Sequence, residues 1–322
     1  DRKCLYVNMN NFYFQGRGIA DFAREFYNEG GRVLLIDQVF KHPEWSPELR
    51  KCYDMYPNLK IVFTGSSVMR LKEENPELNN IVKSYNLRGF SFREFLNLKT
   101  GNHFSPYTLD EILRDHERIV KDILPKVSPL SFFQDYLHHG FYPFFQEQRN
   151  YSENLLKTMN MVTEVDILLI KQIELKYLTK IKKLFYLLAL EGNKAPNVSW
   201  LAQEIETSRA TVMNYIKYLA DARLTNMIYP KGCEFPKKPS KVMMHNTNLM
   251  YAIYPIAVKR QDVMETFFVN TMWKDHNVNQ GAKDDFYWVD GSLKFKICNA
   301  NDFEKKKFRQ DTIYARYNTE VG

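Results

Sequence analysis

Two short apolar segments with polar ends constrain the fold of this chain more than any other feature of its sequence. The first covers residues 32–37, ends at Asp37 and is followed by Gln38. The second covers residues 59–67 and becomes polar from Thr64 onward. Short runs of Val, Ile, Leu and Phe that end in polar residues are typical of buried parallel strands whose carboxyl ends open on a ligand site. The two segments therefore predict a parallel sheet with such a site at one edge.

Strands and helices alternate through the first hundred residues. Besides the two apolar segments, the pattern predicts a strand over residues 3–9 and helices over 19–28 and 43–55. This β-α-β-α-β order with short turns indicates a parallel sheet flanked by helices. We also expect a strand over residues 84–87.

The polar ends of the two strands form the candidate site. Asp37 is placed to hold Mg²⁺ through a bound nucleotide, because Mg²⁺ takes few protein ligands and relies on phosphate oxygens; the alternative is that it caps the next turn. Gln38 can orient a water molecule but cannot accept its proton, which predicts nucleotide binding with slow hydrolysis. Thr64 and Ser66 are expected either to contact a γ-phosphate or water, or to satisfy turn amides near Gly65.

The middle of the chain is predominantly helical. Ser91 and Glu94 have the spacing of a capping box and predict a helix that begins there. A helical apolar period continues from residue 108 to about 190, with a turn at 137–143.

Residues 176–232 have the pattern of a winged helix-turn-helix, with Ser199 as the expected cap of its second helix. The expected elements are helices over 178–190, 198–205 and 208–222 and a strand over 224–229. The third helix carries side chains of the kinds that reach phosphates and base edges. These are Arg209, Thr211, Asn214 and Lys217.

Charge permits DNA as a partner without demanding it. The formal net charge is +7. Residues 198–232 hold four basic and three acidic side chains, a net of +1, which is weak for a DNA-binding surface. A purely structural winged domain is therefore the alternative for this region.

The C-terminal part predicts a mixture of helix and strand, with an amphipathic helix over 264–272 and a hairpin over 285–298. Three charged side chains near the hairpin suggest a nuclease-like arrangement: Asp285, Lys294 and Lys296. We favour other functions, because the second strand of the hairpin lacks the acid that such a metal site needs.

Length and composition exclude several classes of protein. The chain has 322 residues, 44% of them hydrophobic, which is enough for two or three globular domains. Its four cysteines are far apart and form no C-x-x-C pair, so we expect reduced thiols in a cytoplasmic protein rather than a zinc site. No apolar run reaches membrane-spanning length, and no signal peptide is visible. Because the chain starts at Asp1 rather than Met, we expect a fragment or a trimmed chain.

Several segments together resemble a known family. Residues 34–46 resemble the Walker B region of prokaryotic AAA-type ATPases whose C-terminal half carries winged-helix and restriction-nuclease-like regions. Residues 59–67 resemble the sensor strand of these ATPases, and residues 87–96 the segment after it. Two further segments, 245–251 and 265–268, resemble later parts of the same proteins.

The resemblance implies ATP and Mg²⁺ as cofactors, with Mg²⁺ at Asp37, and a role in sensing phosphate or water near residues 64–67. It also implies a catalytic carboxylate at the position where this chain has Gln38. Two other features depart from the family. No glycine is followed by lysine, so the phosphate-binding P-loop is absent from this sequence, and residues 295–300 replace the acidic nuclease motif.

We therefore expect an α/β protein with an incomplete P-loop ATPase-like parallel sheet, a helical lid, a winged helix and a small mixed α/β C-terminal domain. The expected boundaries are 1–100, 101–175, 176–232 and 233–322. The leading hypothesis is an AAA-type ATPase-like chain with impaired hydrolysis, which binds nucleotide and is compatible with oligomer formation. The alternative is a non-enzymatic DNA-binding or scaffold protein that uses the winged helix.

Overall fold

The computed structural model describes residues 3–66, 75–147, 150–281, 285–299 and 311–317. By their internal contacts the residues divide into two units, Asp1–Leu87 and Arg88–Gly322. None of the helices in the described ranges combines the length and apolar character that crossing a membrane requires.

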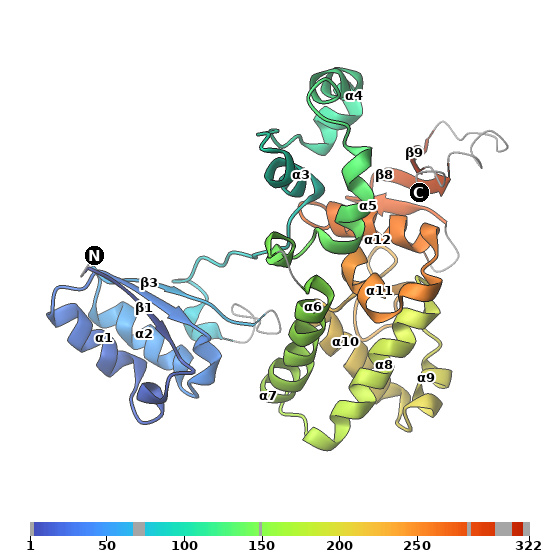
Figure 1. Ribbon diagram of the computed structural model, residues 1–322. Helices are drawn as coiled ribbons and strands as arrows, with labels where there is room; N and C mark the ends of the chain where they lie inside the picture. The colour runs from blue at the N-terminus through green and yellow to red at the C-terminus, as the bar shows by residue number, and fades with distance from the viewer. Residues whose placement is uncertain (1–2, 67–74, 148–149, 282–284, 300–310, 318–322) are drawn as a thin grey trace. The chain divides into compact units, whose positions relative to one another are not determined.

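The first unit is built on a parallel sheet with the strand order β1-β2-β3 (Figure 1). Its elements are β1 (Cys4–Asn8), α1 (Ile19–Asn28), β2 (Val33–Asp37), α2 (Trp45–Met55) and β3 (Lys60–Phe63). The predicted β-α-β-α-β order is confirmed. The strand predicted over residues 84–87 is wrong: the segment has no regular structure, and Tyr85 and Leu87 are largely exposed rather than paired in a sheet.

Both helices of this unit cover the same face of the sheet (Figure 1). Leu34 and Ile36 of β2 are fully buried in a core that includes Ala23 of α1 and Cys52 of α2. Residues alternate between faces along a strand, so the side chain of Asp37 lies on the opposite face. Within the described part of the unit, this second face has no helix over it.

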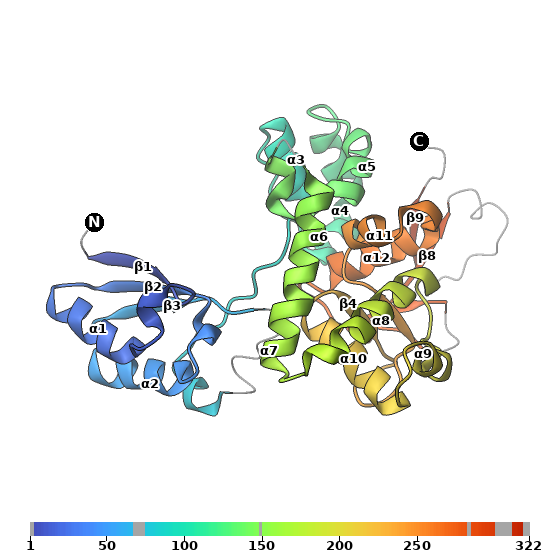
Figure 2. The same ribbon diagram turned by 60° about the horizontal axis from the view of Figure 1, so that its bottom comes forward.

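The second unit is mainly helical, with two small sheets (Figure 2). Its helices are α3 (Phe92–Thr100), α4 (Leu109–Ile123), α5 (Leu130–His139), α6 (Tyr151–Met161), α7 (Leu168–Ile170), α8 (Leu178–Glu191), α9 (Val198–Glu204), α10 (Arg209–Asp221), α11 (Thr247–Ile253) and α12 (Arg260–Met272). Its strands are β4 (Thr225–Ile228), β5 (Lys241–Met244), β6 (Val278–Asn279), β7 (Tyr287–Val289), β8 (Leu293–Asn299) and β9 (Ile313–Tyr317). A π-helical turn, Val162–Ile167, joins α6 to α7.

Local sequence signals set several of these boundaries. The Ser91–Glu94 capping box begins α3 as predicted, with both reciprocal hydrogen bonds present. The predicted cap at Ser199 is wrong. Helix α9 begins at Val198, and the side chain of Asn197 accepts the hydrogen bond from the Trp200 amide. Asparagine is as good an N-cap as serine, so the residue two positions earlier takes the role.

The segment predicted as the winged helix contains three helices, α8, α9 and α10, followed by β4, which pairs antiparallel with β5. These elements agree with the predicted helices and strand, while the winged-helix assignment itself stays a prediction. The β7–β8 hairpin is confirmed, and its turn uses positive φ angles at Asp290 and Gly291. Helix α12 is confirmed, but it is not simply amphipathic because Glu265 and Thr266 are buried with its apolar side chains.

One buried amide joins three segments of the second unit. The side chain of Asn248 at the start of α11 accepts hydrogen bonds from the Phe141 amide at 2.9 Å and from the Tyr151 hydroxyl. Its NH₂ group donates to the carbonyls of Tyr136 and Leu137 at 3.0 and 2.7 Å. Asn248 is 1% exposed, so this amide is fully used without water.

Replacing Asn248 with Asp should lower the free energy of unfolding by about 2–4 kcal/mol, because a carboxylate cannot donate to the two carbonyls and would be buried. Urea unfolding followed by circular dichroism measures the change. Asn214→Asp, at an exposed position of α10, is the matched control and should change stability by less than about 0.5 kcal/mol. Equal stability of the two variants would contradict this account of Asn248.

Candidate functional site

The carboxylate of Asp37 lies at the carboxyl edge of the parallel sheet and receives four hydrogen bonds. Its Oδ2 accepts from the Tyr6 hydroxyl at 2.8 Å and from Asn8 Nδ2 at 2.9 Å. Its Oδ1 accepts from the Gln38 amide at 3.0 Å and from the Thr64 hydroxyl. We call these five residues the polar cluster.

Strand register brings the polar cluster together. Asn8 is the direct partner of Asp37 in the β1–β2 pairing. The Thr64 amide donates to the Ile36 carbonyl at 2.9 Å, which extends the β2–β3 pairing by one residue. The carboxyl ends of parallel strands meet at one edge of the sheet. Asn8 and Thr64, which are 29 and 27 residues away from Asp37 in the sequence, therefore reach the same carboxylate.

These hydrogen bonds favour the charged form of Asp37. The Thr64 hydroxyl makes the largest contribution to lowering the pKa of the carboxyl group, partial burial opposes it, and the Tyr6 hydroxyl and Gln38 amide lower the pKa further. The net shift is downward, so Asp37 is ionised at neutral pH. The sheet edge thus presents one negative charge on its open face.

Gln38 enters the polar cluster through its backbone. Its φ of 56° and ψ of 42° place it in the left-handed region, where the chain turns sharply after β2. This turn directs its amide to Asp37 and, at 3.2 Å, to the Thr64 hydroxyl. Ser66 lies past the end of β3, and its predicted contact with phosphate or water stays a prediction. Ser67 lies outside the described residues.

The polar cluster fits Mg²⁺ that brings most of its own ligands. Among the described residues no three His, Cys, Asp or Glu side chains converge to hold a metal ion. Asp37 is the single carboxylate of the cluster, which matches the preference of Mg²⁺ for one or two carboxylates plus water and phosphate oxygens. Both oxygens of Asp37 already accept two hydrogen bonds, so a cation or its bound water must replace a donor. Tyr6, 60% exposed, is the donor that can leave most easily.

The four residues predicted to contact DNA differ in their exposure and in their hydrogen-bond partners. Arg209 and Asn214 are exposed on α10. The Thr211 hydroxyl hydrogen-bonds to Ser208 Oγ at 2.8 Å, and Lys217 forms an ion pair with Asp221 on the same helix. Their role in DNA binding stays a prediction.

The charged residues near the C-terminal hairpin are held in ion pairs. Lys296 pairs with Asp285 at 3.7 Å, and Lys294 pairs with Asp311 at 3.3 Å. The described carboxylates here form no metal cluster. The predicted nuclease-like arrangement therefore gains no support from the side chains.

A buried acid in this region was missed by sequence reasoning. Glu265 of α12 is 8% exposed and binds Lys241 at 2.6 Å, the Tyr287 hydroxyl at 2.7 Å and the Gln261 amide at 2.8 Å. The only sequence signal was an acidic residue within an otherwise apolar helical stretch.

Replacing Asp37 with Asn should destabilise the first unit by about 1–2 kcal/mol at pH 7, because the new NH₂ group cannot accept from Tyr6 and Asn8. The folded-state pKa of Asp37 lies below its unfolded value, so the stabilisation is present above about pH 4 and is lost as pH falls through the folded-state pKa. The difference between wild type and variant should therefore shrink at pH 3.

Urea unfolding monitored by Trp45, the one tryptophan of residues 1–87, measures this difference once Trp200, Trp273 and Trp288 are replaced by Phe. Asp54→Asn, on the exposed face of α2, is the control and should have little effect at any pH. A gap between wild type and Asp37→Asn that is as large at pH 3 as at pH 7 would refute the assignment of an ionised Asp37.

The part of the chain that contains the polar cluster is similar to a recognised domain type. A family described as "AAA domain" matches residues 1–96, and a family described as a domain of unknown function matches residues 131–257. An uncharacterized protein of Methanocaldococcus jannaschii is 27% identical over 206 residues, which cover 62% of this chain and 43% of that protein. The chain thus spans less than half of this relative, and no solved structure matches.

The family match confirms the expected AAA-type resemblance for the N-terminal part of the chain, which contains Asp37 and Thr64. The expected winged-helix and nuclease-like regions receive no support from the comparisons. The strands β1, β2 and β3 that carry the polar cluster lie within a segment similar to AAA-type ATPase domains.

Proposed function

We propose that the N-terminal unit is an AAA-type nucleotide-binding unit that holds Mg²⁺-ATP at Asp37 and hydrolyses it slowly. The observation that carries the proposal is the ionised Asp37 carboxylate beside Thr64 at the carboxyl edge of a parallel sheet. This is the edge at which open α/β sheets bind their ligands. The match of residues 1–96 to AAA domains supports the same reading.

Each residue of the polar cluster has a distinct part in this proposal. Asp37 would hold the ion, either directly or through metal-bound water, in place of the hydrogen bond from Tyr6. Asn8 and the Gln38 amide keep the carboxylate oriented. The Thr64 hydroxyl, which donates its proton to Asp37, would accept a hydrogen bond from the attacking water, or would turn away from Asp37 to donate to a phosphate oxygen. Bound Mg²⁺ supplies charge neutralisation at the phosphates.

Two features limit the activity of this unit. An amide at position 38 cannot accept a proton from water, so general-base catalysis there is lost. No glycine in the sequence precedes a lysine, so these residues lack the P-loop amides and lysine that supply much of the phosphate affinity in P-loop proteins. We therefore propose weak binding and slow turnover.

Calorimetric titration of Mg²⁺-ATP into the chain tests the binding. We expect saturable heat in the wild type and in Asp54→Ala, and none in Asp37→Ala, because only the last removes the metal-facing carboxylate. Equal binding by wild type and Asp37→Ala would refute the proposal. No binding by any of the three proteins would also refute it and would favour the alternative of a non-enzymatic scaffold.

Restoring a carboxylate at position 38 tests the catalytic part. Gln38→Glu should raise the rate of phosphate release from ATP at least ~10-fold, since a positioned general base contributes about 10²–10⁴-fold. Gln38→Ala should stay as slow as the wild type. If Gln38→Glu binds Mg²⁺-ATP normally and shows no increase in hydrolysis, position 38 does not face the attacking water.

A further inference from the structure

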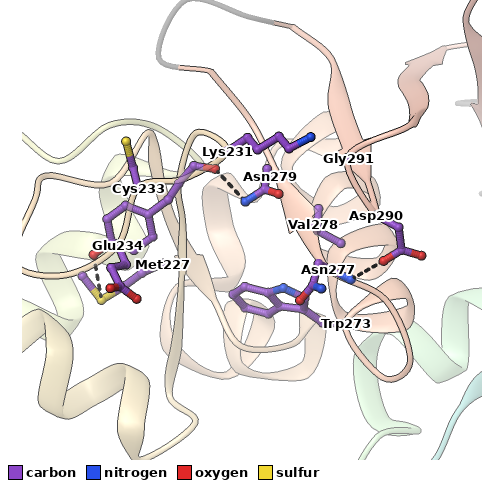
Figure 3. A pocket seen from close by; sticks show the side chains of 11 residues that line it. Met227, Lys231, Cys233, Glu234, Trp273, Asn277, Val278, Asn279, Asp290 and Gly291 are labelled. Carbon is purple, nitrogen blue, oxygen red and sulfur yellow. Dashed lines mark hydrogen bonds between the residues drawn. The ribbon is translucent and has the colours of Figure 1, made fainter.

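A cavity of about 620 Å³ lies in the second unit, and its lining includes no residue to which a function has been assigned above (Figure 3). Its walls come from β4 and the chain after it, the residue that follows α12, strand β6, and the turn between β7 and β8. Its volume is within the usual range of small-molecule sites. Aromatic, amide and charged side chains line it together.

Trp273 gives the cavity an aromatic wall. Its backbone is held on both sides: its amide donates to the Val269 carbonyl at 2.9 Å, and its carbonyl accepts a hydrogen bond from Arg88. Figure 3 shows the indole ring beside Asn277 within the lining. Trp273 is half-buried and lines the cavity, where an aromatic ring can stack with a planar ligand.

Two amide side chains, Asn277 and Asn279, also line the cavity. The Asn279 side chain donates to the Tyr229 carbonyl at 3.3 Å through Nδ2, and its oxygen can still accept a hydrogen bond. The backbone of Asn277 is held by Asp290: its amide donates to Asp290 Oδ1 at 2.8 Å, and its carbonyl accepts from the Asp290 amide at 2.9 Å. Amide groups both donate and accept, as the edges of nucleobases do.

Lys231 adds a positive charge at the rim. It is exposed, and its Nζ lies 2.9 Å from the point where a Cβ on Gly291 would sit. Gly291 has a φ of +69°, a conformation that favours glycine, and this turn lies directly beside the end of the lysine side chain. Among the described residues, Lys231 forms no ion pair. The connection at 229–240 carries three lysines and one acid, Glu234.

We propose that this cavity binds a nucleotide unit, with the base stacked on Trp273, its edge on Asn277 and Asn279, and its phosphate on Lys231. An aromatic wall accepts any base because every base has a π-face, and a flanking lysine binds the phosphate. The residues that line the cavity belong to the second unit, and Asp37 belongs to the first. The nucleotide comes either from solution or from a single strand of nucleic acid.

Two probes distinguish these sources. One is AMP, and the other is a fluorescein-labelled oligothymidylate of about twelve nucleotides, whose binding is measured by fluorescence anisotropy. Stacking contributes enough that Trp273→Ala should weaken binding at least ~10-fold, while Trp273→Phe should largely preserve it. Lys231→Ala should weaken binding and reduce its salt dependence, whereas Lys238→Ala, in the same connection but outside the lining, should weaken it less.

Binding of AMP that competes with the oligonucleotide would support a free nucleotide as ligand, and binding of the oligonucleotide alone would support a strand. The proposal is overturned if neither probe binds the wild type, or if Lys231→Ala binds as Lys238→Ala does. It is also overturned if Trp273→Ala, shown by circular dichroism to be folded, binds like the wild type. Running the titrations in the Asp37→Ala background keeps this result separate from that of the ATP site.

Discussion

Four hydrogen-bond donors from three strands converge on one carboxylate, and the site in the first unit depends on that convergence. Asp37 lies on β2, with Tyr6 and Asn8 on β1 and Thr64 after β3. The same contacts that join the carboxyl ends of the strands keep Asp37 ionised. In the proposed function, a cation would compete with these donors for the lone pairs of Asp37, and at least one donor would have to leave.

A comparison with Asn248 shows why a charged group suits this position. Asn248 uses both donor and acceptor atoms to join buried backbone and side-chain groups, and nothing is left for a ligand. Asp37 accepts only, carries a charge, and has Tyr6 as a largely exposed partner. Exchanging that hydroxyl for metal-bound water conserves the hydrogen bond to Oδ2. The neutral amide of Asn248 is therefore suited to stabilising the fold, and the charged carboxylate of Asp37 to binding a cation.

The sequence was sufficient to locate those helices and strands that a pattern of neighbouring residues specifies. Apolar runs located β2 and β3, a helical period located α1, and the spacing of Ser91 and Glu94 located the start of α3. The approach of Thr64 to Asp37 follows from the parallel register of neighbouring strands. The predicted strand over residues 84–87 failed because alternation over four residues is too short to specify one.

Contacts between distant segments could not be predicted in the same way. Tyr6 and Asn8 reach Asp37 only through the β1–β2 register, which no local pattern specifies. The cavity at Trp273 is formed by segments up to about sixty residues apart, and no single segment carries a motif that indicates a binding site. From the sequence alone, Glu265 would be expected on the surface, because its partners Lys241 and Tyr287 lie on distant segments.

The location of the metal is the most direct test of the central claim. Nuclear magnetic resonance of the chain with Mn²⁺-ATP in place of Mg²⁺-ATP reports it, since the paramagnetic ion broadens the signals of nearby amides. The account predicts that broadening is strongest at Asn8, Gln38 and Gly65 and disappears in Asp37→Ala. Broadening that is spread evenly over acidic surface positions, or that persists in Asp37→Ala, would contradict it.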